Sequence, residues 1–197
     1  MVMRNKKLLE LVDYERQNYQ NNVFYSKNMI TAWLKNEAPY RIWKWQRLSR
    51  FTDYYRSLMY NGVGLSRHLA KILYIIYIRR KQKLGEKLGL EIGTENIGCG
   101  LVIYHYNNVI NACAIIGKNC HLHGSNVIGN NGKSLDAPII GDNVMLGAGS
   151  KVLGPVTIAD NIKIAAGAIV VHSFLESGIT IAGIPAKKVD KKRQMSI

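Results

Sequence analysis

Cysteine is scarce in this chain of 197 residues, and its three cysteines, Cys99, Cys113 and Cys120, form no CxxC pair. This spacing suits neither a zinc site nor a disulfide framework, and it indicates reduced thiols in a cytoplasmic protein. Long apolar runs are also absent, because the most apolar stretch, residues 72–78, has seven residues and ends in RRKQK. Such a run is too short to span a bilayer, and the basic start of the chain lacks the apolar core of a signal peptide. We therefore expect a cytoplasmic protein.

Acidic residues are few, 13 against 27 Lys plus Arg, which gives a formal net charge of +14. Residues 1–87 hold 18 basic and 6 acidic side chains, a net +12, which leaves +2 for the rest. This charge favours a polyanionic partner or an anionic membrane surface near the first segment, and a solvated basic surface explains it equally well. No known nucleic-acid-binding module occurs, so we expect no nucleic-acid partner.

Residues 1–87 are predicted to form an N-terminal α-helical domain, because their apolar residues recur at helical spacing in four segments. Pro39, Gly62 and Gly64 separate the later segments. The last helix, about residues 66–87, carries an apolar face and then a run of Arg and Lys. Such a helix packs on the second domain or lies as a basic amphipathic helix on the inner face of a membrane.

The second half of the chain is organised by a six-residue repeat. Its leading aliphatic residues recur at steps of six, except for a step of seven from 109 to 116 and one of twelve from 128 to 140, where GNNGKSLDAP reads as a loop. Period six fits neither a helix nor an isolated strand, and it indicates a parallel β-helix of three strands per coil. The predicted inward residues are Ile97, Ile103, Val109, Ile116, Leu122, Ile128, Ile140, Leu146, Val152, Ile158, Ile164 and Val170.

The residues that follow the leading positions support this fold. A small residue comes next at most corners, where little room is left for a side chain, and Asn follows at 119, 143 and 161. Asparagine tolerates the left-handed backbone that a tight corner requires.

Histidines are the main acid–base candidates in the repeats. His105 lies two places after Ile103, so its side chain should point out of the coil. His121 and His123 occur one coil later, and the separation 123 − 105 = 18 stacks His123 close to His105, although the seven-residue step blurs the register by one place. No spacing matches a three-histidine zinc site, so we expect no metal.

Three stretches, LEIGTENIGCGLVIYH, DAPIIGDNVMLGAGSKVLG and IAGIPAKKV, resemble the serine acetyltransferase group of hexapeptide-repeat acyltransferases. Within that group they look closest to the branch that acetylates bacterial surface polysaccharides. The resemblance covers about residues 41–189 and implies a left-handed parallel β-helix over residues 88–189. The residues after it, 190–197, read as a basic tail. The resemblance also implies a homotrimer and acetyl-CoA as acyl donor.

The resemblance places the family's catalytic histidine on His105, as the general base that takes a proton from an acceptor hydroxyl. The orienting carboxylate falls on Glu91, and His123 is the candidate to assist or replace that carboxylate. The residues expected to contact CoA are Gly129, Asn130, Ala148 and Ala166 along its pantetheine arm, and Lys187 and Lys188 at its phosphates.

The acceptor side is assigned to Tyr104, Tyr106, Asn107 and Asp136. Serine acetyltransferases carry an acidic residue where this chain has Tyr104, and Arg-His where it has Asp136 and Ala137. These differences make free L-serine a poor fit, so we expect an O-acetyltransferase that acts on a sugar hydroxyl of a capsular or exopolysaccharide precursor. Two alternatives stay open: a serine O-acetyltransferase of cysteine biosynthesis, and an inactive β-helix scaffold or CoA-binding protein.

Overall fold

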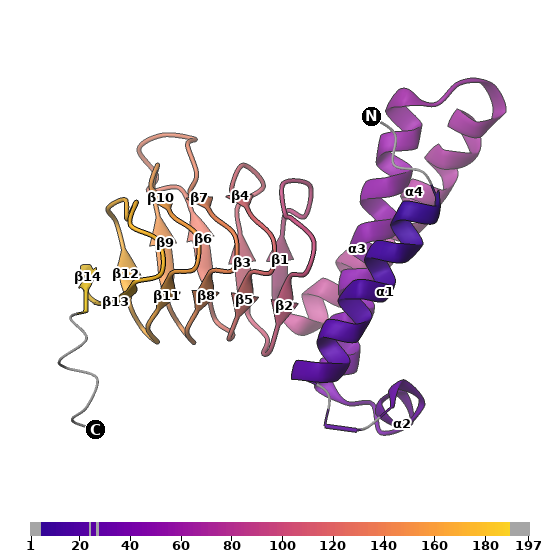
Figure 1. The fold of residues 1–197 in the computed structure, drawn as a ribbon. Helices are drawn as coiled ribbons and strands as arrows, with labels where there is room; N and C mark the ends of the chain where they lie inside the picture. The colour runs from indigo at the N-terminus through magenta and orange to yellow at the C-terminus, as the bar shows by residue number, and fades with distance from the viewer. Residues whose placement is uncertain (1–4, 24, 27, 190–197) are drawn as a thin grey trace. The chain divides into compact units, whose positions relative to one another are not determined.

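The computed structural model describes residues 5–23, 25, 26 and 28–189 of the chain. The predicted basic tail, residues 190–197, lies outside them. The chain divides into two compact units, Met1–Leu90 and Glu91–Ile197. The first is helical and the second is built of short, mostly parallel strands (Figure 1). This architecture confirms the predicted left-handed parallel β-helix with an N-terminal helical region.

Helices of the first unit pack through large buried side chains, among them Leu8, Tyr19, Ile42 and Trp45. Helix α3 starts with Pro39 in its first turn, where proline's missing N–H leaves no intrahelical bond unmade. Helix α4 is capped at its C-terminus by Gly89, whose backbone is left-handed with φ of 61°. The described helices are α1 (Asn5–Asn22), α2 (Met29–Leu34), α3 (Ala38–Asn61) and α4 (Gly64–Leu88).

One face of α4 packs on α3, and another is open to solvent. Tyr77 stacks on Phe51 of α3 with ring centroids 5.3 Å apart. The open face carries Leu65, Leu69 and Ile72, which are 75%, 52% and 57% exposed. Across the part of the chain that the structure describes, none of the helices is long and apolar enough to cross a membrane.

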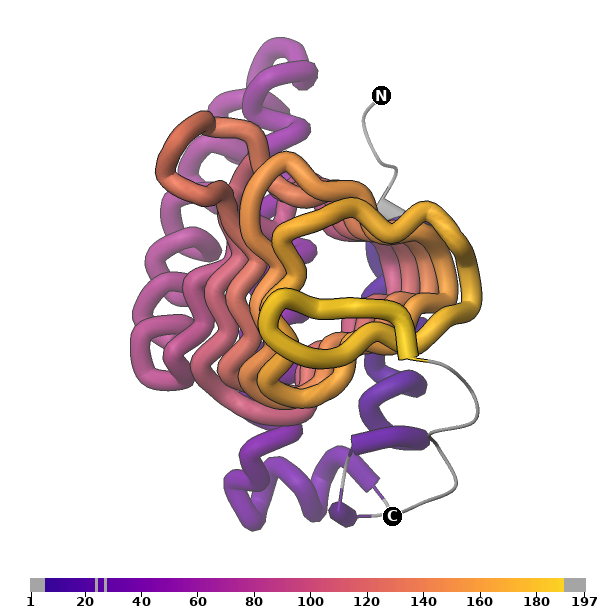
Figure 2. The backbone as a smooth tube through the Cα atoms, turned by 90° about the vertical axis from the view of Figure 1, so that its left-hand side faces the viewer, coloured from indigo at the N-terminus to yellow at the C-terminus, as the bar shows by residue number. Residues whose placement is uncertain are grey.

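Strands of the second unit form three sheets that run along the faces of a prism (Figure 2). Sheet A contains β1 (Leu90–Ile92), β3 (Asn108–Ile110), β6 (Val127–Gly129), β9 (Lys151–Leu153) and β12 (Ile169–Val170). Sheet B contains β4 (Ile115–Ile116), β7 (Ile139–Ile140) and β10 (Thr157–Ile158). Sheet C contains β2 (Val102–Ile103), β5 (His121–Leu122), β8 (Met145–Leu146), β11 (Lys163–Ile164), β13 (Thr180–Gly183) and β14 (Ala186–Lys188).

The core of the prism is a stack of the predicted leading residues, with one correction. Ile103, Leu122, Ile128 and the others are no more than 6% exposed, but Val109 is 39% exposed and the buried residue of its strand is Ile110, at 2%. The sequence offers two adjacent β-branched residues there, and either could lead the repeat. The seven-residue step therefore runs from Ile103 to Ile110, one repeat earlier than predicted, and the extra residue lies in the corner that carries His105.

The predicted corner asparagines adopt the left-handed backbone, with φ of 53° at Asn119, 57° at Asn143 and 60° at Asn161. Their side chains form a ladder, in which Asn119 donates to Asn143 at 3.1 Å and Asn143 donates to Asn161 at 3.2 Å. Residues 130–138 form the predicted loop, which leaves the prism between sheets A and B.

Candidate active site

His105 lies at the corner where the chain passes from β2 in sheet C to β3 in sheet A, and its side chain is exposed. We call this edge of the prism the C–A corner. Directly beneath it in the next coil is Gly124, whose backbone has φ of +106°. A Cβ built on Gly124 would come within 2.6 Å of the Cβ of His105. Only glycine leaves room for His105 at this position.

Small residues continue the C–A corner in the coils beyond Gly124. The N–H of Gly149 donates to the carbonyl of Gly124 at 2.9 Å, and the N–H of Gly167 donates to the carbonyl of Ala148 at 2.9 Å. These bonds stack the corners that carry Gly124, Ala148 and Ala166, and both alanines are exposed. The predicted base and two of the predicted CoA-contacting residues therefore share one edge of the prism.

Beside this corner, sheet C carries a second line of side chains that begins with two aromatic rings. Tyr104 follows β2 and His123 follows β5, and both strands are in parallel register. The register then sets Gly147, Ala165 and Ala182 in line, because each follows an aligned strand residue. Along this line of sheet C, the first two coils therefore carry aromatic rings, and the coils that follow carry only glycine or alanine.

Tyr104, His121 and His123 form a cluster next to His105. The hydroxyl of Tyr104 lies 3.1 Å from Nδ1 of His121, and the Tyr104 ring stacks on His123 with centroids 4.5 Å apart. The predicted 18-residue stacking of His123 on His105 is one place off, since Val102 pairs with His121 and 121 − 102 = 19. In the next coil, His123 is therefore the neighbour of Tyr104, and Gly124 is the neighbour of His105.

Both histidines of this cluster favour their neutral forms. Burial lowers the pKa of His121, and the neighbouring His123 lowers it further. Burial likewise lowers the pKa of His123, with a smaller contribution from the charge of His105. The pKa of Tyr104 is raised by burial, so its hydroxyl stays protonated. A neutral hydrogen-bonding surface therefore borders His105.

Two polar residues that the sequence pattern did not single out lie under the corner. Asn108 and Asn126 are fully buried, and Nδ2 of Asn108 donates to the backbone carbonyl of His105 at 2.8 Å. Asn126 is a clue in the sequence, because it stands 18 residues after Asn108 at a core-facing position.

Other predicted site residues lie further from His105 or make other contacts. Glu91 lies exposed on β1, and within the residues that the structure describes no hydrogen bond or ion pair joins it to His105. Lys188 forms an exposed ion pair with Glu176 at 2.6 Å. Lys187 is exposed on β14 at the far end of sheet C. The pairing of Glu91 with His105 and the phosphate contacts stay predictions.

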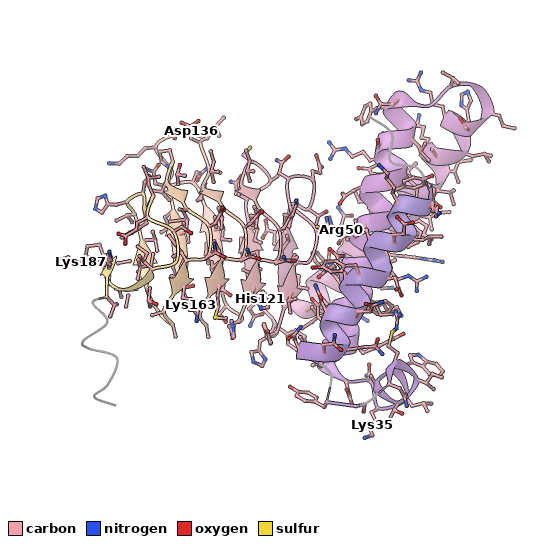
Figure 3. All side chains as sticks on the ribbon, viewed as in Figure 1. Lys35, Arg50, His121, Asp136, Lys163 and Lys187 are labelled. Atoms are coloured by element: carbon pink, nitrogen blue, oxygen red, sulfur yellow. The ribbon has the colours of Figure 1, made fainter. Side chains whose placement is uncertain are left out.

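The loop residues occupy a different edge of the prism. Gly129 ends β6 and Asn130 starts the loop between sheets A and B. Asp136 is exposed on that loop, and Figure 3 shows it on the edge opposite His121. Asp136 instead borders an open hollow of about 530 Å³ that is lined by apolar side chains, among them Ile115 and Ile139. One chain by itself does not bring Asp136 to His105.

Comparison with known proteins agrees with this architecture. A model of the bacterial transferase hexapeptide (six repeats) family matches residues 137–172. The chain is 32% identical over 155 residues to a serine acetyltransferase of Helicobacter pylori, an alignment that covers 76% of this chain and 88% of that protein. It is 29% identical to a serine acetyltransferase of Staphylococcus epidermidis over 140 residues, which cover 70% of this chain and 60% of that protein. The chain belongs to the serine acetyltransferase family.

Solved structures of serine acetyltransferases share the fold. The enzyme of Neisseria gonorrhoeae in complex with serine superposes with a TM-score of 0.67 at 24% identity, over 94% of this chain and 70% of that one. The soybean enzyme complexed with serine gives a TM-score of 0.69 at 22% identity, with the same coverage. As a member of the serine acetyltransferase family, the protein is an acetyl-CoA-dependent O-acetyltransferase.

This membership corrects the predicted acceptor. The expectation of a polysaccharide precursor is wrong, because the relatives and the structural neighbours are serine acetyltransferases. The prediction gave most weight to Tyr104, Asp136 and Ala137. The last two lie on the loop of residues 130–138, and three local differences do not outweigh an alignment over 155 residues.

Proposed function

We propose that the protein transfers the acetyl group of acetyl-CoA to the hydroxyl of L-serine, which gives O-acetyl-L-serine and free CoA. His105 takes the proton of the serine hydroxyl as that oxygen attacks the thioester carbonyl. The C–S bond then breaks, and the CoA sulfur leaves with the proton that His105 returns. The enzyme needs no metal for this exchange of one ester for another.

The observation that carries the proposal is that His105 lies on the C–A corner, in an earlier coil than those that carry Ala148 and Ala166. Its side chain is exposed, and the exposed Ala148 and Ala166 follow it along the same edge. Alanine corners let an extended chain such as pantetheine approach the backbone closely, so that its thioester can reach the imidazole. Gly129 and Asn130, at the neighbouring corner, flank the other side of sheet A.

We propose that the acceptor contacts Tyr104, Tyr106 and Asn107, which share the corner between β2 and β3 with His105. Asn107 has a left-handed backbone with φ of 63° and its side chain is exposed, so it is available for hydrogen bonding. Glu91, one coil earlier, is the carboxylate that we propose to stabilise the imidazolium of His105 during transfer.

We propose a homotrimer as the working assembly, because in one chain Asp136 lies between sheets A and B, whereas His105 lies at the C–A corner. A neighbouring chain would bring the loop with Asp136 to the C–A corner of the first. To test this, a His105→Ala chain and an Asp136→Ala chain are unfolded, mixed and refolded together, and the activity of the mixture is measured. Activity above that of either variant alone supports a shared site, and equal activity argues for sites within single chains.

The reaction itself is tested by incubating the purified protein with acetyl-CoA and L-serine and measuring free thiol, with O-acetyl-L-serine identified by mass spectrometry. Saturable formation of both products supports the proposal. Thiol release with a hexose but not with L-serine, or no binding of acetyl-CoA, would overturn it. D-serine is the matched acceptor control, because it carries the same groups in the opposite arrangement.

Contact of the helical unit with a membrane stays a prediction. The open face of α4 has apolar residues towards its start and Arg80, Lys83 and Lys87, all exposed, towards its end. Co-sedimentation with anionic and with neutral liposomes at low salt measures this contact, and equal recovery with both would exclude it.

A further inference from the structure

A line of buried polar side chains runs along the inner side of the C–A corner. Asn108, Asn126 and Ser150 are each 0% exposed. The N–H of Asn126 donates to Oδ1 of Asn108 at 3.1 Å, and Nδ2 of Asn126 donates to Oγ of Ser150 at 3.0 Å. The three side chains thus connect three successive coils, and we call them the buried polar ladder.

Two of the three ladder residues, Asn108 and Asn126, also hold the backbone of a corner. Asn108 donates to the carbonyl of His105 at 2.8 Å. Asn126 accepts from the N–H of Gly124 at 3.0 Å and donates to the carbonyl of Gly147 at 2.7 Å. The ladder therefore ties the corner of the proposed base to the two corners that follow it along the same edge.

The fold does not require polar residues at this position. Strand register aligns the residues that precede Val109, Val127, Lys151 and Ile169, so Ala168, before β12, takes the place that the ladder residues take at β3, β6 and β9. Ala168 is 1% exposed, so a buried alanine is accommodated there. Among these four aligned positions, the two amide side chains are at β3, which follows the corner of His105, and at β6 in the next coil.

The backbone of the corner that carries His105 is irregular, so a hydrogen bond that fixes its conformation has a large effect there. This corner holds one residue more than a regular six-residue step, and Asn107 within it has a left-handed backbone. A longer corner has more conformations available than a regular one. The bond from Asn108 to the carbonyl of His105 selects one of them and is shielded from water, where it is strongest.

We propose that Asn108, supported by Asn126, is a positioning residue that holds His105 over Gly124 for acetyl transfer. The inference rests on the proposed function, in which His105 is the general base. Asn108 itself is buried and does not touch the substrates. Its effect is on the geometry of His105, so it should act on kcat and leave the binding of acetyl-CoA largely intact.

Steady-state kinetics of Asn108→Ala, Asn126→Ala and Asn108→Ser test this. We expect Asn108→Ala to lower kcat by about ten- to a hundredfold with the KM for acetyl-CoA within about twofold. Asn108→Ser should recover part of the loss, since its hydroxyl can still donate at a position where Ser150 shows that serine fits. The matched control is Asn143→Ala, which removes a rung of the other asparagine ladder, at the corner between sheets B and C, and should keep kcat.

A second readout does not depend on turnover. In NMR spectra of histidine-labelled protein, Asn108→Ala should shift or broaden the His105 ring signals and leave those of the exposed His172 in place. Unchanged His105 signals, or an unchanged kcat in Asn108→Ala, would overturn the inference. If the wild type transfers no acetyl group, the proposed function fails, and the NMR comparison still decides whether Asn108 positions His105. If Asn108→Ala does not fold, Asn126→Ala and Asn108→Ser carry both measurements.

Discussion

The ring of Tyr104 stacks on the ring of His123 with the centroids 4.5 Å apart and the planes inclined by 16°. This stacking distinguishes His123, the candidate to assist the base, from His105, the predicted base. His123 is half-buried, and its Nε2 is shielded without a hydrogen-bond partner among the described residues. His105 is exposed at the corner. The exposed imidazole of His105 can reach a bound hydroxyl, whereas the imidazole of His123 is packed against Tyr104.

The roles of these histidines lead to the first prediction. His105→Ala should lower kcat by about 10²- to 10⁴-fold, because it removes the general base. His123→Ala removes one aromatic stack and should cost no more than about tenfold. Both are measured by thiol release from acetyl-CoA in the presence of L-serine. The reverse order of losses would place the base on His123, one coil along.

A second prediction concerns the stability of the helical unit. Glu15 and Arg50 are 1% and 7% exposed and form an ion pair at 2.7 Å. Arg50→Met should lower the free energy of unfolding by about 3–5 kcal/mol, because the buried carboxylate of Glu15 loses its guanidinium. Urea denaturation followed by circular dichroism measures the change.

The exposed pair of Arg16 and Asp13 provides the control for this measurement. Arg16→Met should leave the denaturation midpoint nearly unchanged, because water screens that pair. Equal losses of unfolding free energy in Arg50→Met and Arg16→Met would show that burial does not determine the contribution of an ion pair to stability.

The sequence predicts the coil well and its irregular corner poorly. A repeat of six places a side chain inside or outside wherever one aliphatic residue leads, and asparagine marks the left-handed corners. Adjacent Val109 and Ile110 give no such signal, because either can be buried. The error moved the extra residue to the wrong corner and shifted the expected partner of His105.

Contacts between coils set the remainder of the site. Tyr104 meets His123, and Asn108 meets Asn126, only when the strand register is known. Buried asparagine also contradicts the apolar pattern of a core, so a search for periodic aliphatic residues passes over it. The acceptor was mispredicted for a related reason: single residue differences were read without their positions in the fold.

The cluster beside His105 predicts a pH dependence of stability. The pKa values of His121 and His123 are lowered in the folded protein, mainly by burial. The unfolded chain therefore binds more protons below about pH 6.5, and stability is lost as the pH falls from there through the folded-state values. The melting temperature should fall between about pH 7 and pH 5 in wild type.

Replacing both histidines isolates their contribution. The double variant His121→Gln, His123→Gln should show a smaller fall in melting temperature over the same range, since it carries no proton-binding group at these positions. An identical pH profile in the two proteins would assign the loss of stability to other groups.

The close approach of Gly124 to His105 gives the most direct test of the site's geometry. Gly124→Ala adds a Cβ that would lie 2.6 Å from the Cβ of His105, so the imidazole must move. We expect kcat to fall by about a hundredfold, the loss that a displacement of about 1 Å can cause. Some stability is lost as well, because alanine disfavours the backbone φ of +106°.

Gly178→Ala separates these two effects. Gly178 has φ of +75°, and a Cβ there would meet no atom within 4 Å, so the substitution strains the backbone without displacing a neighbour. It should lower the melting temperature and keep kcat. If Gly124→Ala retains full kcat while its melting temperature falls as in Gly178→Ala, the position of His105 over Gly124 does not control acetyl transfer.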